Sequence, residues 1–262
     1  MKMKGVLKMG NIAKYRKRKV ALLTAAVVAS AWMPTAWALP SGETNIQNLV
    51  INKNGEKMEV VLRDGNTRGA VDWQSFSIGK NEKVNFSGPD AYKWMVLNRV
   101  IGNTASEIYG SLTSGANGTI FLVNPNGILF GENSYVDVGS LVASTMDIKQ
   151  ADFMNMQKNT FVFDETGTNK AVTISKGADI TARDGYVAIF AHEIEINNAG
   201  TITAPEVAMA GGKSVELSYD DKINLVVNVS NDSKKATVDT KNNYVLMTAK
   251  DANNIIGDSI KF

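Results

Sequence analysis

The side chains in this chain that could do acid–base chemistry are few and scattered. The 262 residues contain one histidine, His192, and no cysteine. These counts exclude thiol catalysis, Cys-ligated zinc and metal sites with several histidines. Glu193/Glu195 and Asp220/Asp221 have the residue types of a glycosidase acid–base pair, although such carboxylates are more often solvated on a strand face. No Walker loop or GxGxxG context is present, and we expect no metal site, no cofactor and no catalytic centre.

Serine nucleophiles are also disfavoured. Ser77 and Ser106 have no histidine and aspartate nearby in the sequence, which argues against a Ser–His–Asp triad. An enzymatic function therefore depends on the carboxylate pairs. The alternative function is accordingly a secreted enzyme that acts on polysaccharide.

The basic residues are concentrated at the N-terminus. The whole chain has 28 Lys and Arg, 26 Asp and Glu, and a formal net charge of +2. The first 38 residues hold eight of the basic residues and no acidic one, so the remainder has 20 basic against 26 acidic residues, a net charge of −6. A negative net charge makes nucleic acid a poor partner.

This N-terminal segment has the organisation of a secretory signal peptide. A charged block at 14–19 precedes the apolar run at 20–31, and the small residues Ala36 and Ala38 occupy positions −3 and −1 of a cleavage site. The apolar run is shorter than the roughly 20 residues that a membrane-spanning helix needs. The sequence predicts export and cleavage after Ala38, which leaves Leu39 as the first residue.

The rest of the chain is dominated by β-strand signals. Short Val-, Ile- and Phe-rich runs alternate with Asn-Gly and Asp-Gly pairs, which are typical of strands and tight turns. The runs lie at 58–62, 119–123, 186–190 and 223–229, and the turn pairs at 54–55, 64–65, 117–118, 126–127 and 184–185. Only 91–96 and 146–156 suggest a turn or two of helix. The spacing predicts an all-β protein, either a sandwich or a solenoid.

A repeat of 20 to 22 residues favours the solenoid. Residues 174–182 align with 196–204 at an offset of 22, and 187–188 align with 207–208 at an offset of 20. This period is typical of one coil of a parallel β-helix. We expect a third copy to begin at 215–217, and an irregular cap with hairpins and extra strands before about Leu141. The runs at 244–249 and 259–262 suggest further coils that stop in mid-coil, as in a fragment of a longer protein.

The densest group of motifs lies between residues 71 and 148, and it resembles a known family. In order, the segments are 71–79 (VDWQSFSIG), 84–86 (VNF), 97–102 (LNRVIG), 106–112 (SEIYGSL), 120–131 (IFLVNPNGILFG) and 136–145 (VDVGSLVAST). This combination resembles the secretion domain of filamentous-haemagglutinin-like exoproteins, the secreted partners in two-partner secretion. Its signature is Asn124-Pro125-Asn126-Gly127-Ile128. An upstream NPNL tetrad found in some members is absent here.

The resemblance implies a fold and a route. Members have a right-handed parallel β-helix with an N-terminal cap and extra-helical strands. They use the general secretion machinery, and then an outer-membrane β-barrel transporter with POTRA domains recognises them and passes them to the cell surface. Folding there starts the β-helix for a downstream adhesin, haemagglutinin, cytolysin or contact-dependent toxin, through which a host or bacterial surface ligand is bound. The expected domains are the signal peptide 1–38, the cap and first coils 39–145, and continuing coils 146–262.

The signature pentapeptide also has a physical interpretation. Pro125 fixes its φ and Asn126-Gly127 suits a turn with positive φ, while the side chains of Asn124 and Asn126 can form Asx turns. The segments 120–123 and 128–130 on either side would be core strands. The motif is therefore a rigid corner, a transporter-recognition element or both. The second family motif that we select comprises Asn98, Arg99, Val100 and Gly102.

Overall fold

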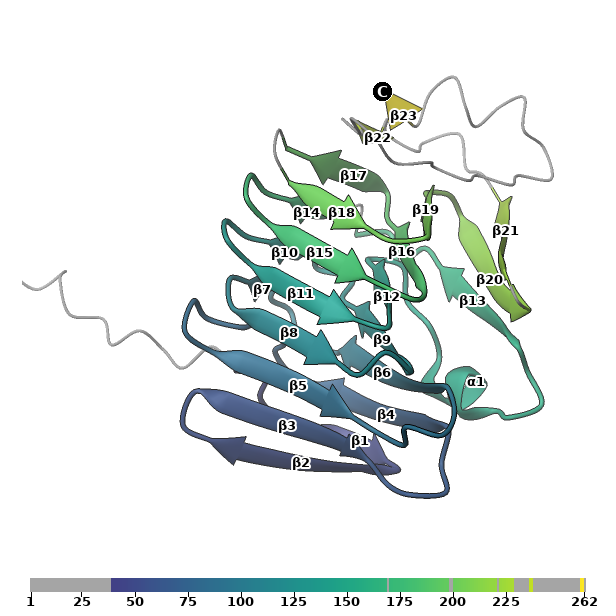
Figure 1. The fold of residues 1–262 in the computed structure, drawn as a ribbon. Helices are drawn as coiled ribbons and strands as arrows, with labels where there is room; N and C mark the ends of the chain where they lie inside the picture. The colour runs from purple at the N-terminus through teal and green to yellow at the C-terminus, as the bar shows by residue number, and fades with distance from the viewer. Residues whose placement is uncertain are drawn as a thin grey trace, which may run out of the picture. The chain divides into compact units, whose positions relative to one another are not determined.

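The strands wind into a right-handed parallel β-helix (Figure 1). The computed structural model describes residues 39–168, 170–197, 200–220 and 222–228, together with the two short strands at 236–237 and 260–261. Each coil contributes strands to three sheets, and successive coils stack so that these strands pair. A fourth, antiparallel sheet lies outside the coils. The predicted all-β class is thus confirmed, and it is a solenoid rather than a sandwich.

Sheet 1 is buried on both faces. Its strand order is β1-β4-β6-β9-β12-β16-β19, and every residue of β4, β9, β12 and β16 is buried. Continuous apolar runs are typical of parallel strands that are covered on both sides. The strands are β1 (Thr44–Gln47), β4 (Arg68–Trp73), β6 (Trp94–Val100), β9 (Gly118–Val123), β12 (Ser140–Ser144), β16 (Tyr186–Phe190) and β19 (Glu206–Ala210).

Sheets 2 and 3 have one buried and one exposed face. Their strands alternate between buried and accessible residues, as β11 and β14 show, because neighbouring side chains point to opposite faces. Sheet 2 contains β2 (Leu49–Asn54), β3 (Lys57–Leu62), β5 (Lys83–Ser87), β8 (Ser111–Ser114), β11 (Tyr135–Val138), β15 (Asp179–Ala182) and β18 (Thr201–Thr203). Sheet 3 contains β7 (Ser106–Ile108), β10 (Ile128–Phe130), β14 (Ala171–Ile174), β17 (Glu193–Ile196), β22 (Ala236–Thr237) and β23 (Ile260–Lys261).

The repeat predicted from the sequence matches the observed strand register. Ile174 pairs with Ile196, Ile180 with Ile202 and Val187 with Val207, each in parallel strands of neighbouring coils. Val187 also continues a buried column of sheet 1 that contains Val96, Ile120 and Leu141. Equal offsets place equivalent apolar residues above one another, which fills the interior of the solenoid continuously.

Two predictions about the extent of the repeat were wrong. The coils begin well before Leu141, because β3 already pairs in parallel with β5, and β4 with β6. The corresponding residues differ more in type there, so the period is harder to see. The expected third copy at 215–217 lies in β20 (Ser214–Asp220), an antiparallel strand outside the coils.

The N-terminal end of the solenoid is closed by antiparallel strands. β1 pairs antiparallel with β4, and β2 pairs antiparallel with β3. The β2–β3 turn uses Gly55 at φ 59°, as its Asn-Gly pair predicted. These two strands cover the first coil, so that the predicted cap is present but shorter than expected.

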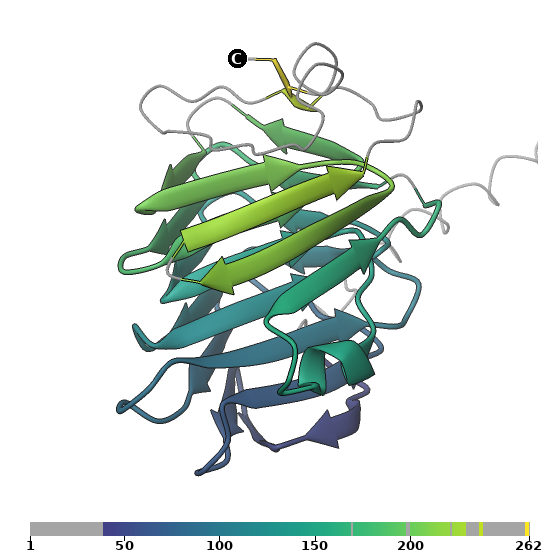
Figure 2. The same ribbon diagram turned by 90° about the vertical axis from the view of Figure 1, so that its right-hand side faces the viewer.

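The extra-helical part covers the outer face of sheet 1 (Figure 2). It comprises α1 (Gln150–Met154), β13 (Thr160–Asp164), β20 and β21 (Lys222–Asn228), with strand order β13-β20-β21. The helix lies within the predicted 146–156. The other predicted helix, 91–96, was wrong, because residues from Trp94 onward form β6, which is held between β4 and β9.

Two apolar clusters result from this arrangement. The inner cluster fills the solenoid. The outer cluster lies between sheet 1 and the extra-helical elements and includes Phe121, Phe153, Phe161, Phe163 and Phe190. In the described part of the chain, no helix is both long and apolar enough to span a membrane.

Candidate functional site

The two selected motifs lie on adjacent coils and meet at one corner of the solenoid. The second family motif, at 98–102, occupies the end of β6 and the turn that leads to β7, whereas the pentapeptide joins β9 to β10. β6 and β9 are paired neighbours in sheet 1, and β7 and β10 are paired neighbours in sheet 3. The chain therefore passes this corner twice, on two adjacent coils.

Asn124 is the buried centre of this corner. It is fully inaccessible to solvent, and its Nδ2 donates to the Thr104 carbonyl and to Ser106 Oγ, both at 2.9 Å. Its Oδ1 accepts the Asn126 backbone N–H at 2.9 Å, which is the Asx turn that the sequence predicted. All these hydrogen bonds lie within the protein, so the side chain is a structural support for the turn.

The residues after Asn124 form a tight turn. The Gly127 N–H donates to the Asn124 carbonyl at 3.1 Å. Pro125 takes the second position, and the only positive φ of the turn is the 112° of Gly127, a pattern typical of a type I turn. The turn thus places positive φ at glycine alone, and Ile128 follows as a buried residue of β10.

Asn126 joins the two motifs directly. Its Nδ2 donates to the Gly102 carbonyl at 2.8 Å. Gly102 has no room for a side chain, because a Cβ atom there would lie 1.9 Å from the Gln74 carbonyl oxygen. The corner therefore needs glycine at 102, where the backbone closely approaches Gln74 of the preceding coil. It also needs an amide donor at 126, which links the following coil back to Gly102.

Asn98 carries its amide into the interior of the solenoid. It is fully buried, accepts a hydrogen bond from Trp73 Nε1 at 3.1 Å and donates to the Phe121 carbonyl at 3.2 Å. Val100 also points inward, into the apolar cluster. Since a buried amide is costly without partners, Asn98 fixes how the first coils stack.

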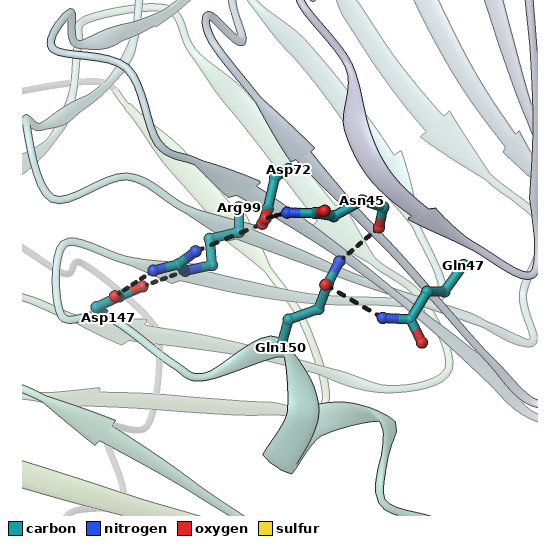
Figure 3. A network of polar contacts seen from close by, with 6 residues as sticks. All are labelled: Asn45, Gln47, Asp72, Arg99, Asp147 and Gln150. Carbon is teal, nitrogen blue, oxygen red and sulfur yellow. Dashed lines mark hydrogen bonds and ion pairs between the residues drawn. The ribbon is translucent and has the colours of Figure 1, made fainter.

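Arg99 points to the opposite face and organises a polar network (Figure 3). Its Nε and Nη2 each lie 2.7 Å from a carboxylate oxygen of Asp147, and Nη1 lies 3.5 Å from Asp72. The hydrogen bonds with Asp147, opposed by burial and helped by the charge of Asp72, raise the pKa of the Arg99 guanidinium above its ordinary value. Asp72 also accepts a hydrogen bond from Asn45 Nδ2 at 2.7 Å.

The other candidates from the sequence do not converge on a reactive centre. Ser106 accepts the hydrogen bond from Asn124, and Ser77 Oγ accepts the Glu107 N–H at 3.0 Å. His192 lines a small pocket with Thr168 and Lys170. Within residues 39–168, 170–197 and 200–220, no group of three His, Cys, Asp or Glu side chains could hold a metal ion.

The carboxylate pairs and the cleavage site are only partly described. Glu193 and Glu195 are two residues apart on β17, with accessible side chains on the same face. Asp221 lies outside the described residues, as do Ala36 and Ala38. Leu39 is described, and its side chain is buried in the inner cluster.

Sequence reasoning missed residues that complete the corner and the network. Thr168 and Asp147 both contact motif residues, Thr168 through a hydrogen bond from its Oγ1 to the Pro125 carbonyl at 2.5 Å and Asp147 through the pairing of its carboxylate with Arg99. Thr168 and Asp147 lie 43 and 48 residues away from their partners. No local pattern marks such positions, and only the winding of the coils brings them together.

The fold and this corner define a parallel β-helix with an extra-helical cover. The family model described as the TPS secretion domain matches residues 36–262. This match includes most of the chain, and the chain therefore belongs to the family of two-partner secretion domains.

Two curated relatives from Haemophilus influenzae match part of the chain. A heme/hemopexin-binding protein of strain Rd is 38% identical over 128 residues, which cover 48% of this chain and 13% of the relative. A second heme/hemopexin-binding protein is 29% identical over 136 residues, which cover 52% of this chain and 14% of the relative. The matches thus span about an eighth of the relatives' own lengths.

A solved structure of a secretion domain shares the fold. The secretion domain of HMW1 from Haemophilus influenzae superimposes with a TM-score of 0.64 at 23% identity, covering 76% of this chain and 51% of that one. The filamentous hemagglutinin secretion domain gives a TM-score of 0.46 at 14% identity, covering 76% and 75%. The family is a family of secretion domains rather than of enzymes.

Proposed function

We propose that this chain is the secretion-targeting and folding-initiation domain of a larger surface-exposed or secreted adhesin or haemagglutinin. A dedicated outer-membrane transporter of the TpsB type, with POTRA domains, recognises it in the periplasm. The observation that carries the proposal is the match of the family model over residues 36–262. The names of the relatives suggest a heme- or hemopexin-binding exoprotein as a second candidate for the whole protein.

The cap supports the folding-initiation role. Antiparallel β1 and β2 close one end of the coil stack, so further coils can be added only in the direction of the C-terminus. Each completed coil presents unpaired backbone groups that template the next one. A chain that reaches the surface with its N-terminal part first would start to fold at this end.

The burial of the signature motif limits how a transporter could use it. Asn124 has no accessible surface in the folded domain, so it acts through the fold or is contacted only before folding. Pro125 and Asn126 are partly accessible, and Ile101, beside Gly102, is 42% exposed. A transporter that contacts the folded corner would reach these three residues together with the exposed Asn103 and Thr104.

Secretion assays with the cognate transporter test the proposal. We expect Asn124→Ala and Asn126→Ala to retain the product in the periplasm, whereas Asn117→Ala, at a partly accessible position in the turn that joins β8 to β9, should be secreted normally. Immunoblots of periplasm and medium measure the distribution. Normal secretion of both motif variants would contradict recognition or folding control by this corner.

A second pair of variants separates contact from folding. Ile101→Ser changes the accessible surface of the corner and leaves Asn124 in place. Reduced secretion of Ile101→Ser, with an unchanged unfolding midpoint of the purified protein, would support direct contact. Normal secretion of Ile101→Ser, with a lowered midpoint for Asn124→Ala, would place the role of the motif in folding.

The domain limits proposed from the sequence can be checked in the same cells. We place the leader at residues 1–38, the cap and first coils at 39–145 and the following coils at 146–262, with Leu39 as the first residue after cleavage. The burial of Leu39 supports its inclusion in the folded domain. N-terminal sequencing of the secreted product should begin at Leu39.

The polysaccharide enzyme is not favoured, because the family is one of secretion domains. Glu193 and Glu195 are the candidate carboxylates whose backbone and burial are described. A reducing-sugar assay on acidic polysaccharides tests this alternative, and we expect no release of sugar.

A further inference from the structure

The segment between β12 and β14 crosses the solenoid rather than following its winding. Residues 146–168, here called the latch, include α1 and β13. Within the latch, α1 lies over the outer face of sheet 1 beside the N-terminal coils, as Figure 2 shows. β13 then pairs with β20, which follows the last described strand of sheet 1. The latch thus connects the first coils to the extra-helical sheet.

Arg68 holds the latch by an unusual arrangement. Its Nη1 donates to the carbonyls of Phe153 and Asn155 at 2.8 Å, and its Nη2 donates to the Lys158 carbonyl at 2.7 Å. Arg68 is only 6% exposed, and none of the ion pairs in the described part of the chain includes it. Its positive charge is therefore balanced by the carbonyl oxygens at and beyond the end of α1.

Aromatic rings complete the site around Arg68. The guanidinium carbon lies 5.1 Å from the centroid of the Phe161 ring and 6.0 Å from that of Phe153, which is the geometry of cation–π contacts. Burial lowers the pKa of Arg68, but an arginine stays charged under all physiological conditions. If the latch moved away, the guanidinium would lose the oxygen atoms that solvate it here.

A second set of contacts ties the latch to β6 and to β1 of the cap. Asp147 forms the bidentate ion pair with Arg99. Gln150 Nε2 donates to the Asn45 carbonyl at 2.9 Å, and its Oε1 accepts from Gln47 Nε2 at 3.2 Å (Figure 3). These hydrogen bonds join residues up to 105 positions apart, whereas neighbouring coils pair at separations of 20 to 28 residues, or 44 to 46 where the latch intervenes. Closing such long loops is entropically unfavourable until the coils exist.

We propose that the latch is a separate cooperative unit that docks on the finished N-terminal coils, and that Arg68 is the residue that pins it. The parallel strands of sheet 1 keep their own hydrogen bonds when the latch opens. Opening exposes the outer face of sheet 1, including the Phe121 ring. The domain therefore has two folded forms, one with the outer aromatic face covered and one with it open.

Native-state hydrogen exchange on the protein tests this proposal. In Arg68→Met the loss of hydrogen bonds to a charged group should speed exchange of the latch amides by about 10- to 100-fold. The reporters are the amides of Phe153, Asp147 and Asp164, which are hydrogen-bonded within the latch. Amides of β9 and β12 should change less than about 3-fold, as expected for a separate unit. Arg63→Met, at an exposed arginine, is the matched control and should leave both groups unchanged.

Two results would overturn the proposal. Equal acceleration of the latch and of β9 and β12 would show one cooperative unit, and unchanged exchange of the latch would show that Arg68 does not pin it. If Arg68→Met fails to fold, Asp147→Asn removes the charge of the second tie with little change of shape. The same criterion then applies, with faster exchange expected in the latch alone.

Discussion

Sheets 1 and 2 are made from the same coils, yet they differ in how many of their faces are buried. On sheet 1 the outward column Leu97, Phe121 and Val142 lies in the outer apolar cluster. On sheet 2 the outward positions of the same coils are polar. Thr113 Oγ1 donates to Asn85 Oδ1, and Asn85 Nδ2 donates to Glu59, both at 2.8 Å. The coiled backbone therefore requires apolar side chains on the inner face of each sheet, whereas the outer faces of the sheets can differ.

The residue types on the outer face of each sheet depend on whether other elements cover that face. The extra-helical elements supply Phe153, Phe161 and Phe163, whose ring centroids lie 5.0, 5.4 and 6.4 Å from that of Phe121. Burying this surface is a favourable contribution that sheet 2 lacks. The segment 146–168 therefore contributes to the stability of sheet 1 and is not merely a loop on its surface.

The largest expected effect comes from emptying the outer cluster. Phe121→Ala should lower the free energy of unfolding by about 3–5 kcal/mol, the usual cost of removing a buried phenylalanine ring. Tyr135→Ala removes an aromatic ring from the outer face of sheet 2, where Tyr135 is 42% exposed, and should change stability by less than about 0.5 kcal/mol. Urea unfolding of both variants measures the difference. Similar losses at the two sites would contradict the contrast between the sheets.

The two sheets also differ in the space at their corners. Gly102 follows β6 of sheet 1, and its Cβ position is blocked by the Gln74 carbonyl at 1.9 Å, whereas Gly115 follows β8 of sheet 2 and has nothing within 4 Å. Gly102→Ala should cost about 3 kcal/mol, because the backbone has to move. Gly115→Ala should be tolerated with little change, and thermal unfolding compares the two. A stable Gly102→Ala variant would show that the corner can relax.

A smaller effect distinguishes two asparagines that face opposite ways. Asn98 on sheet 1 is buried between Trp73 and the Phe121 carbonyl, whereas Asn85 on sheet 2 makes its contacts at the accessible face. Asn98→Ala should cost about 2 kcal/mol, because it leaves buried polar groups without a partner. Asn85→Ala should cost about 0.5 kcal/mol or less. Denaturant midpoints measured under one set of conditions decide whether the inward amide matters more.

Much of the coil could be predicted from local sequence. The offset of 22 between Ile174 and Ile196 predicted a pairing that the structure confirms. It did so because one coil repeats one pattern of inward side chains. Earlier coils escaped detection, since sheet 1 carries Asn98 where a later coil carries an apolar residue. Trp94–Val100 was partly mistaken for a helix, because a short apolar run does not reveal its period.

The turn at the corner could be predicted from the sequence, but the contact between the two motifs there could not. Pro125 and Gly127 indicated the turn by their own backbone preferences. The hydrogen bond from Asn126 to Gly102 depends on stacking, which the local sequence does not encode. Asp147 and Arg68 carry no recognisable motif, although both hold the latch.

The sequence by itself determined the class of this protein, since strand period, turn residues and motif order act locally and survive in a linear reading. It also fixed the candidate leader, which depends only on the order of charged, apolar and small residues. Only the tertiary structure decided which strands leave the coil, which face of sheet 1 is covered and which side chains meet at the corner. Those outcomes depend on contacts between residues 18 to 105 positions apart, whose free energy appears only after the chain has wound into coils.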